Sequence, residues 1–141
     1  DDVDRIMQHP MTSIASDGPI TVFGAGSPHP RTYGTFARVL GRYVRDRNIL
    51  SLEEAIRKMT SLPANILSID RRGLIKEGYY ADISIFDPAT IIDKATFEEP
   101  HQYAEGINSV IVNGKVVVEN GAHNGNRPGK VLRGPGYKPN K

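Results

Sequence analysis

The sequence predicts an α/β protein whose first half is helical and whose second half is rich in β-structure. Between residues 36 and 59, apolar residues recur at helical spacing, whereas β-branched residues dominate two runs over residues 107–112 and 115–119. The chain has 141 residues, of which 38% are hydrophobic. This is about the length of one domain, and it allows a core of modest size.

Four helices are predicted in the first half. The first, over residues 3–7, has apolar residues at helical spacing and ends before Pro10. Ser51 and Glu54 have the spacing of a capping box and begin the third helix. Pro63 suits the first turn of a short fourth helix, where its missing N–H costs nothing. The second helix carries one apolar stripe, formed by Phe36, Val39, Leu40, Tyr43 and Val44.

A carboxylate and a guanidinium flank a loop between the first two helices. The short apolar run over residues 12–15 predicts a buried strand, and Asp17 follows its end. A loop rich in glycine and proline then leads to Arg31. A carboxylate at a strand end beside a loop is a common arrangement in catalytic sites. On spacing alone, however, a turn-forming aspartate is the better interpretation of Asp17. For Arg31, the alternative to a binding role is a surface arginine on the loop.

The second half contains one strand signal and one hairpin signal. Residues 83–86 predict a strand, and Asn113-Gly114 joins the two β-rich runs into a hairpin with a type I′ turn. Residues 125–141 are rich in glycine, proline and basic residues and predict an extended tail. Because three strands alone are marginally stable in water, we expect additional strands from elsewhere.

Composition excludes several classes of protein and site. Eighteen basic and sixteen acidic residues give a net charge of +2, which indicates neither a nucleic-acid partner nor a membrane surface. The chain has no cysteine, which excludes disulfides and thiolate metal sites and fits a cytoplasmic location. His9, His101 and His123 lack the spacing of metal ligands. The first residue is Asp1 rather than methionine, so we expect a segment of a longer or processed protein.

Several phrases stand in an order and spacing typical of one family. They are Ser16-Asp17-Gly18, His29-Pro30-Arg31, Leu62-Pro63-Ala64, Gly78-Tyr79-Tyr80-Ala81-Asp82, Phe97-Glu98-Glu99-Pro100-His101-Gln102-Tyr103 and Val112-Asn113-Gly114. With them the chain resembles the N-acyl-D-amino-acid deacylases (D-aminoacylases) of the amidohydrolase superfamily along almost its whole length. It departs from the family pattern between Gly18 and His29, where it is more apolar.

The resemblance implies the C-terminal segment of a larger α/β fold. Residues 1–70 would be the C-terminal part of a (β/α) TIM-type barrel, with residues 12–15 as the last strand and outer helices after it. Residues 71–141 would supply the C-terminal strands of a small β-sandwich and an extended tail.

The resemblance also implies a zinc-dependent hydrolysis of the amide bond in N-acyl-D-amino acids. Asp17 would be the catalytic carboxylate that carries a proton, and it could also ligate the metal. Arg31 would bind the α-carboxylate of the substrate. His29 would be a second substrate-binding residue, which either supports the loop or approaches the site itself. The remaining metal ligands would lie in the missing N-terminal segment, so this chain alone is expected to bind no zinc and to be inactive. Two alternatives remain open: a segment of another cyclic-amide or aryl-amide amidohydrolase, and a non-catalytic interaction module.

Overall fold

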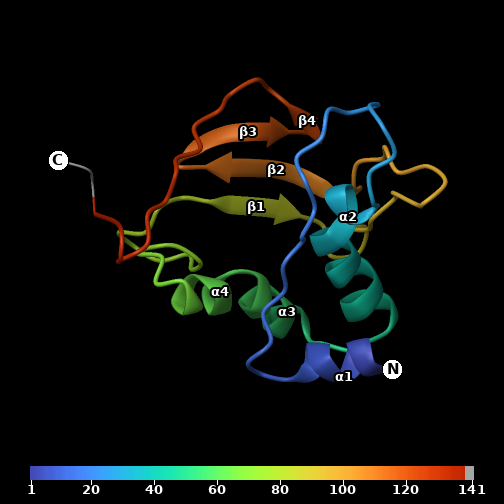
Figure 1. Ribbon diagram of the computed structural model, residues 1–141, viewed down its shortest axis with the longest axis horizontal. Helices are drawn as coiled ribbons and strands as arrows, with labels where there is room; N and C mark the ends of the chain where they lie inside the picture. The colour runs from blue at the N-terminus through green and yellow to red at the C-terminus, as the bar shows by residue number, and fades with distance from the viewer. Residues whose placement is uncertain (139–141) are drawn as a thin grey trace.

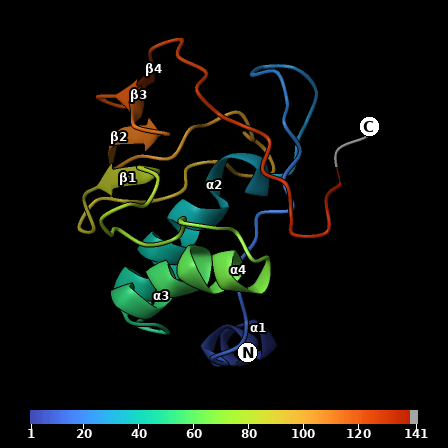
Figure 2. The same ribbon diagram turned by 90° about the vertical axis from the view of Figure 1, so that its left-hand side faces the viewer.

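The computed structural model describes residues 1–138 and places a four-stranded sheet above a layer of helices (Figure 1). Figure 2 shows α3 and α4 below the sheet and α1 farther still from it. Helices precede strands along the chain, as the sequence predicts. The elements are α1 (Asp2–Gln8), α2 (Arg31–Arg38), the π-helix η1 (Val39–Asp46), α3 (Leu52–Met59), α4 (Ser61–Ile66), β1 (Ile83–Phe86), β2 (Ile107–Val112), β3 (Lys115–Glu119) and β4 (Ala122–His123).

Helix α3 begins where the sequence predicts, but its capping box is only half formed. The Ser51 hydroxyl accepts a hydrogen bond from the backbone N–H of Glu54 at 3.2 Å. The Glu54 carboxylate turns to Arg57 instead of the cap, and accepts from its Nε at 2.7 Å and its Nη2 at 2.8 Å. This two-point contact is the strong geometry for an arginine–carboxylate pair.

The Glu54–Arg57 contact predicts an acid-sensitive contribution to stability. The hydrogen bond from Arg57 lowers the pKa of Glu54 from its ordinary value of 4.5 to about 2. A carboxyl whose pKa is lower in the folded state stabilises the fold above its unfolded pKa and loses this effect as the pH falls. We therefore expect Glu54→Gln to reduce the loss of stability between about pH 4.5 and about pH 2. Urea unfolding at several pH values measures this, with the exposed neighbour Glu53→Gln as control; equal pH profiles for Glu54→Gln and the native protein would contradict it.

One continuous helical segment changes its geometry halfway. Residues 31–38 are α-helical, whereas Val39–Asp46 form the π-helix η1, in which Arg47 N–H donates to the carbonyl of Arg42. Gly41 lies in η1, against the chain at residues 91 and 92. A Cβ atom at Gly41 would lie 2.5 Å from the Ile91 carbonyl oxygen, so only glycine permits this approach.

We expect Gly41→Ala to destabilise the protein by roughly 1–3 kcal/mol, because the new methyl group would force the backbone at Ile91 away. The direction is informative, since alanine normally favours a helix over glycine by about 1 kcal/mol. Urea unfolding measures the change. Gly129→Ala is the matched control, because no atom lies within 4 Å of its added Cβ. If Gly41→Ala leaves the free energy of unfolding unchanged or raises it, the contact between Gly41 and Ile91 is not tight.

The sheet is an antiparallel meander in the order β1-β2-β3-β4. The predicted hairpin is confirmed: Asn113 and Gly114 have φ values of 47° and 77°, the two positive values of a type I′ turn. Asp82 precedes β1 and accepts a hydrogen bond from the Asn113 backbone N–H at 2.7 Å. The same carboxylate pairs with Arg72. The sequence did not predict the two-residue strand β4.

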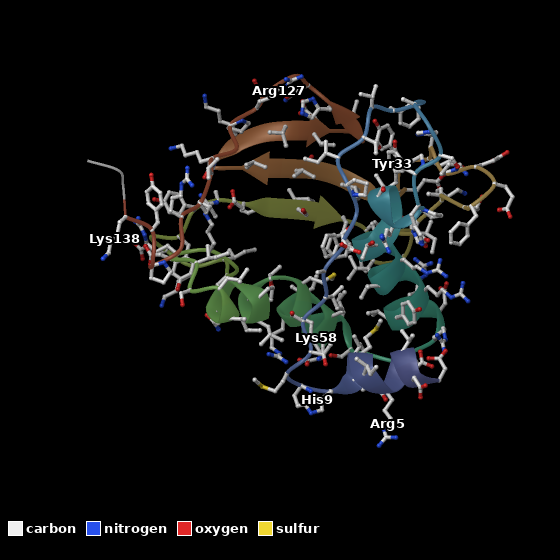
Figure 3. The ribbon with its side chains drawn as sticks, in the orientation of Figure 1. Arg5, His9, Tyr33, Lys58, Arg127 and Lys138 are labelled. Carbon is white, nitrogen blue, oxygen red and sulfur yellow. The ribbon has the colours of Figure 1, made fainter. Side chains whose placement is uncertain are left out.

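Residues 12–15 form no β-ladder within residues 1–138, in contrast to the predicted strand. The Ile14 N–H instead donates to the carbonyl of Lys58 at the end of α3, at 3.0 Å. The Lys58 side chain is fully buried, and its ammonium donates to the carbonyls of His9 and Thr12. Figure 3 shows Lys58 between α3 and α1, and His9 just beyond the end of α1. A β-strand forms backbone hydrogen bonds with a neighbouring strand. Residues 12–15 lie beside α3 instead, and therefore form no ladder in the described part of the chain.

The core joins the helices to the long connection between β1 and β2, residues 87–106. Ile91 in this connection is 2% exposed and belongs to a cluster with the helical residues Ala37, Val39, Leu40 and Ala55 and with Leu50, which lies between η1 and α3. Phe86 and Ile107, at the ends of the two strands, pack against the same cluster. Within the described residues, no helix is long and apolar enough to cross a membrane.

Candidate functional site

The structure brings two of the predicted site residues into contact. The Arg31 Nη2 atom lies 3.2 Å from the Asp17 Oδ2 atom. The Asp17 side chain is 86% exposed and that of Arg31 is 44% exposed, so other groups have access to both. An exposed ion pair of this kind contributes little to stability. The pair therefore places two opposite charges at an accessible position and contributes little to the free energy of folding.

Backbone conformation and one hydroxyl hold the two ends of the loop together. Asp17 has a φ of 51°, in the left-handed region that aspartate tolerates better than most residues. The Ser16 hydroxyl donates to the Arg31 carbonyl at 3.1 Å. A Cβ atom at Gly18 would lie 2.9 Å from the Thr32 Cα atom, so the first residue of the loop packs directly against the backbone of α2. These contacts place Asp17 at the N-terminal end of α2, beside Arg31.

His29 supports the start of α2. Its Nδ1 atom accepts a hydrogen bond from the Arg31 N–H at 3.0 Å. Its ring packs edge-on against Phe97, with ring centroids 4.9 Å apart. His29 thus links the first turn of α2 to the connection between β1 and β2. Its predicted contact with a substrate stays a prediction.

A cavity of about 530 Å³ opens beside these residues. His29 and Arg31 line it together with η1, the segment at Ile14 and residues 95–98. Arg38 and Asp93 also line it and form an ion pair at 2.8 Å, in which the Asp93 side chain is 10% exposed. Sequence reasoning did not single out this pair, because its members stand 55 residues apart and neither belongs to a recognisable spacing.

An aromatic cluster lies at the far side of the loop. It consists of Phe23 in the loop, Tyr33 in α2, and His101 and Tyr103 in the connection between β1 and β2. Figure 3 labels Tyr33 at the upper end of α2, next to the loop. The sequence alone indicates no role for His101. The signal that could have identified it is its place within the phrase Phe97–Tyr103.

Among residues 1–138, no three histidine, cysteine, aspartate or glutamate side chains gather in a way that could hold a metal ion. Asp17 offers one carboxylate, and its charged partner in the structure is a cation, Arg31. A catalytic zinc site needs three protein ligands. The described residues could therefore contribute to such a site but do not form one.

Comparison with known proteins gives consistent matches. Residues 1–118 match the model of the amidohydrolase family. An N-acyl-D-aspartate deacylase from Alcaligenes xylosoxydans xylosoxydans is 47% identical over 132 residues, which cover 93% of this chain and 26% of that protein. A solved D-aminoacylase, described as having a binuclear metal centre, is 48% identical with a TM-score of 0.82, and the match covers 89% of this chain and 26% of that one.

A second solved structure extends the comparison. An N-acyl-D-glutamate deacylase from Bordetella bronchiseptica, complexed with zinc and a phosphonate mimic of the tetrahedral intermediate, is 45% identical with a TM-score of 0.76. The match covers 82% of this chain and 24% of that one. The chain thus spans about a quarter of the length of these relatives.

Proposed function

Because the chain belongs to the amidohydrolase family, we propose that it is the C-terminal segment of a longer enzyme that hydrolyses N-acyl-D-amino acids to a carboxylate and a free D-amino acid. One observation carries the proposal: the exposed carboxylate of Asp17 lies 3.2 Å from the guanidinium of Arg31. Such a pair offers a proton acceptor beside a group that binds carboxylates. The substrate class agrees with the activities for which the similar proteins are named.

The reaction needs a group that moves a proton, and Asp17 is the candidate. Zinc, held mainly by ligands outside this chain, would polarise the amide carbonyl and lower the pKa of a water molecule. The Asp17 carboxylate would accept the proton of this water and return it to the departing amine. Its exposure of 86% suits a carboxylate that faces a part of the enzyme beyond these residues. It could also serve as one metal ligand.

Arg31 is the candidate for binding the α-carboxylate of the substrate. A planar guanidinium holds a carboxylate through two parallel hydrogen bonds. In the structure the Asp17 carboxylate occupies one side of this guanidinium. We propose that the substrate carboxylate takes over this contact when it binds, with His29 fixing the backbone of Arg31 through its hydrogen bond.

The family membership supports a finer description of the fold as well. Residues 1–70 would belong to the end of a (β/α) TIM-type barrel, where residues 12–15 pair with barrel strands from the rest of the enzyme. Residues 71–141 would contribute strands to a β-sandwich completed by the other end of the enzyme. The free edge of β1 is available for such pairing within the described sheet. The cytoplasmic location stays a prediction.

The proposal is tested by assaying the intact enzyme for release of D-amino acids. We expect hydrolysis of N-acetyl-D-amino acids, little hydrolysis of their L-enantiomers, and loss of activity on chelation that added zinc restores. Cyclic amides such as hydantoins serve as the comparison substrates. An intact, zinc-loaded enzyme that releases no D-amino acid would refute the proposal, and preference for the cyclic amides would favour the alternative amidohydrolase activity.

Arg31→Ala is expected to raise the KM for N-acetyl-D-amino acids by roughly ten- to a hundredfold, the value of a hydrogen-bonded charge contact. The same change should have little effect on the matching primary amides, because these lack the carboxylate. Steady-state kinetics with both substrates measures the difference. Arg5→Ala, an exposed arginine in α1, is the control. An equal loss for acids and amides would argue against a carboxylate contact.

A further inference from the structure

Two polar contacts join His101 to the loop that connects Asp17 with Arg31, and a third joins it to α2. The His101 Nδ1 atom lies 3.1 Å from the Gly24 backbone nitrogen and 3.0 Å from the Tyr33 hydroxyl. The His101 Nε2 atom lies 2.9 Å from the Gly26 carbonyl oxygen. One imidazole thus contacts the backbone of the loop, residues 18–28, at two points, and α2 at a third.

The contacts agree on one form of the imidazole. Because the Gly24 N–H can only donate, Nδ1 must accept and carries no proton. The proton is then on Nε2, which donates to the Gly26 carbonyl. The neutral imidazole with its proton on Nε2 therefore satisfies both backbone contacts at once, which neither the other tautomer nor the cation would do.

Aromatic packing secures the same part of the loop. The Phe23 ring stacks on Tyr103 with centroids 4.8 Å apart, and meets Tyr33 edge-on at 5.9 Å. Its neighbours Ile20 and Val22 stay exposed. Phe23 therefore attaches the loop to α2, which carries Arg31, and to the connection between β1 and β2, which carries His101.

We propose that His101 is a positioning residue that holds loop 18–28 closed on α2. The loop runs from Asp17 to Arg31, so its closure keeps these two residues near one another, where one substrate can reach both. His101 touches neither residue and acts through the backbone of Gly24 and Gly26. This inference rests on the proposed function.

Hydrogen exchange tests, without reference to activity, whether His101 holds loop 18–28 closed; we call this set of His101 contacts the clamp. In the intact enzyme, we expect His101→Ala to make exchange in the peptide over residues 18–30 on the order of tenfold faster, because the Gly24 N–H loses its acceptor. His101→Asn, whose amide oxygen can replace Nδ1, should restore part of the protection. His123→Ala is the matched control: this imidazole in β4 also accepts a backbone N–H, from Gly125, but lies outside the loop. Unchanged loop exchange in His101→Ala would overturn the clamp.

Kinetics tests what the clamp does. We expect His101→Ala to raise the KM for N-acetyl-D-amino acids by about tenfold or more, since small misplacements of binding groups have effects of this size. The kcat should fall much less, and His101→Asn should recover part of the KM. Faster loop exchange with an unchanged KM would overturn the role in substrate binding. If the native enzyme hydrolyses none of these substrates, the proposed function fails, whereas the exchange experiment still decides whether His101 holds the loop.

Discussion

Asp17→Asn is expected to reduce the kcat of the intact enzyme by roughly 10²–10⁴-fold, the usual contribution of a positioned proton-transfer group. Asparagine retains the size of the side chain but cannot carry the proton. It also tolerates the left-handed backbone at Asp17, where φ is 51°, so the loop should keep its conformation. Steady-state kinetics with N-acetyl-D-amino acids measures the loss, and circular dichroism verifies the fold.

A matched control separates the role of Asp17 from a general effect of charge. Asp70 is also a strongly exposed carboxylate, 82% exposed, and pairs with the neighbouring Arg71 at 3.0 Å. We expect Asp70→Asn to retain activity. If Asp17→Asn keeps most of its turnover, Asp17 does not move the proton. If both variants lose activity equally, the effect is electrostatic and not specific to Asp17.

Lys58→Met is expected to destabilise the protein by roughly 1–3 kcal/mol, because the part-buried carbonyls of His9 and Thr12 lose a charged donor. The Lys58 side chain is fully buried, and its ammonium donates to the carbonyls of His9 and Thr12. Its Nζ atom also lies 3.5 Å from a Glu54 carboxylate oxygen. Methionine has a similar length and fills the space, so the change tests the hydrogen bonds and the charge rather than the packing.

The midpoint of urea unfolding measures this effect, with Lys115→Met, an exposed lysine in β3, as control. Because Lys58 fixes the segment that leads to Asp17, the variant should also lower turnover at temperatures where it is still folded. A Lys58→Met protein as stable as the native one would show that the two carbonyls find other donors.

Elements with local signals were predicted well from the sequence. The start of α3 at Ser51 and the turn at Asn113-Gly114 depend on residues a few positions apart, and both are present in the structure. Residues 12–15 contact α3 through Lys58, which is more than 40 positions away, and no local sequence pattern predicts this contact. The apolar stripe of the second helix was also only partly informative: Phe36 is 45% exposed, whereas Val39 and Leu40 are buried.

The same distinction holds for the candidate site. Asp17 and Arg31 were identified through short phrases that resemble a family, and the structure places them side by side. The Arg38–Asp93 pair and the contacts of His101 with Gly24 and Gly26 join segments between 55 and 77 positions apart. Only the folded chain brings such residues together, so a single sequence carries no periodicity or spacing that predicts them.

The π-helix η1 has a consequence for how this chain can change in length. A π-turn contains one residue more than an α-turn, as the bond from Arg47 N–H to the Arg42 carbonyl shows. Loss of one residue between Val39 and Asp46 would convert the wide turns to α-helix and keep the flanking residues in phase. Elsewhere in a helix the same deletion turns everything beyond it by about 100°. We therefore expect single-residue deletions among homologous chains to gather in η1.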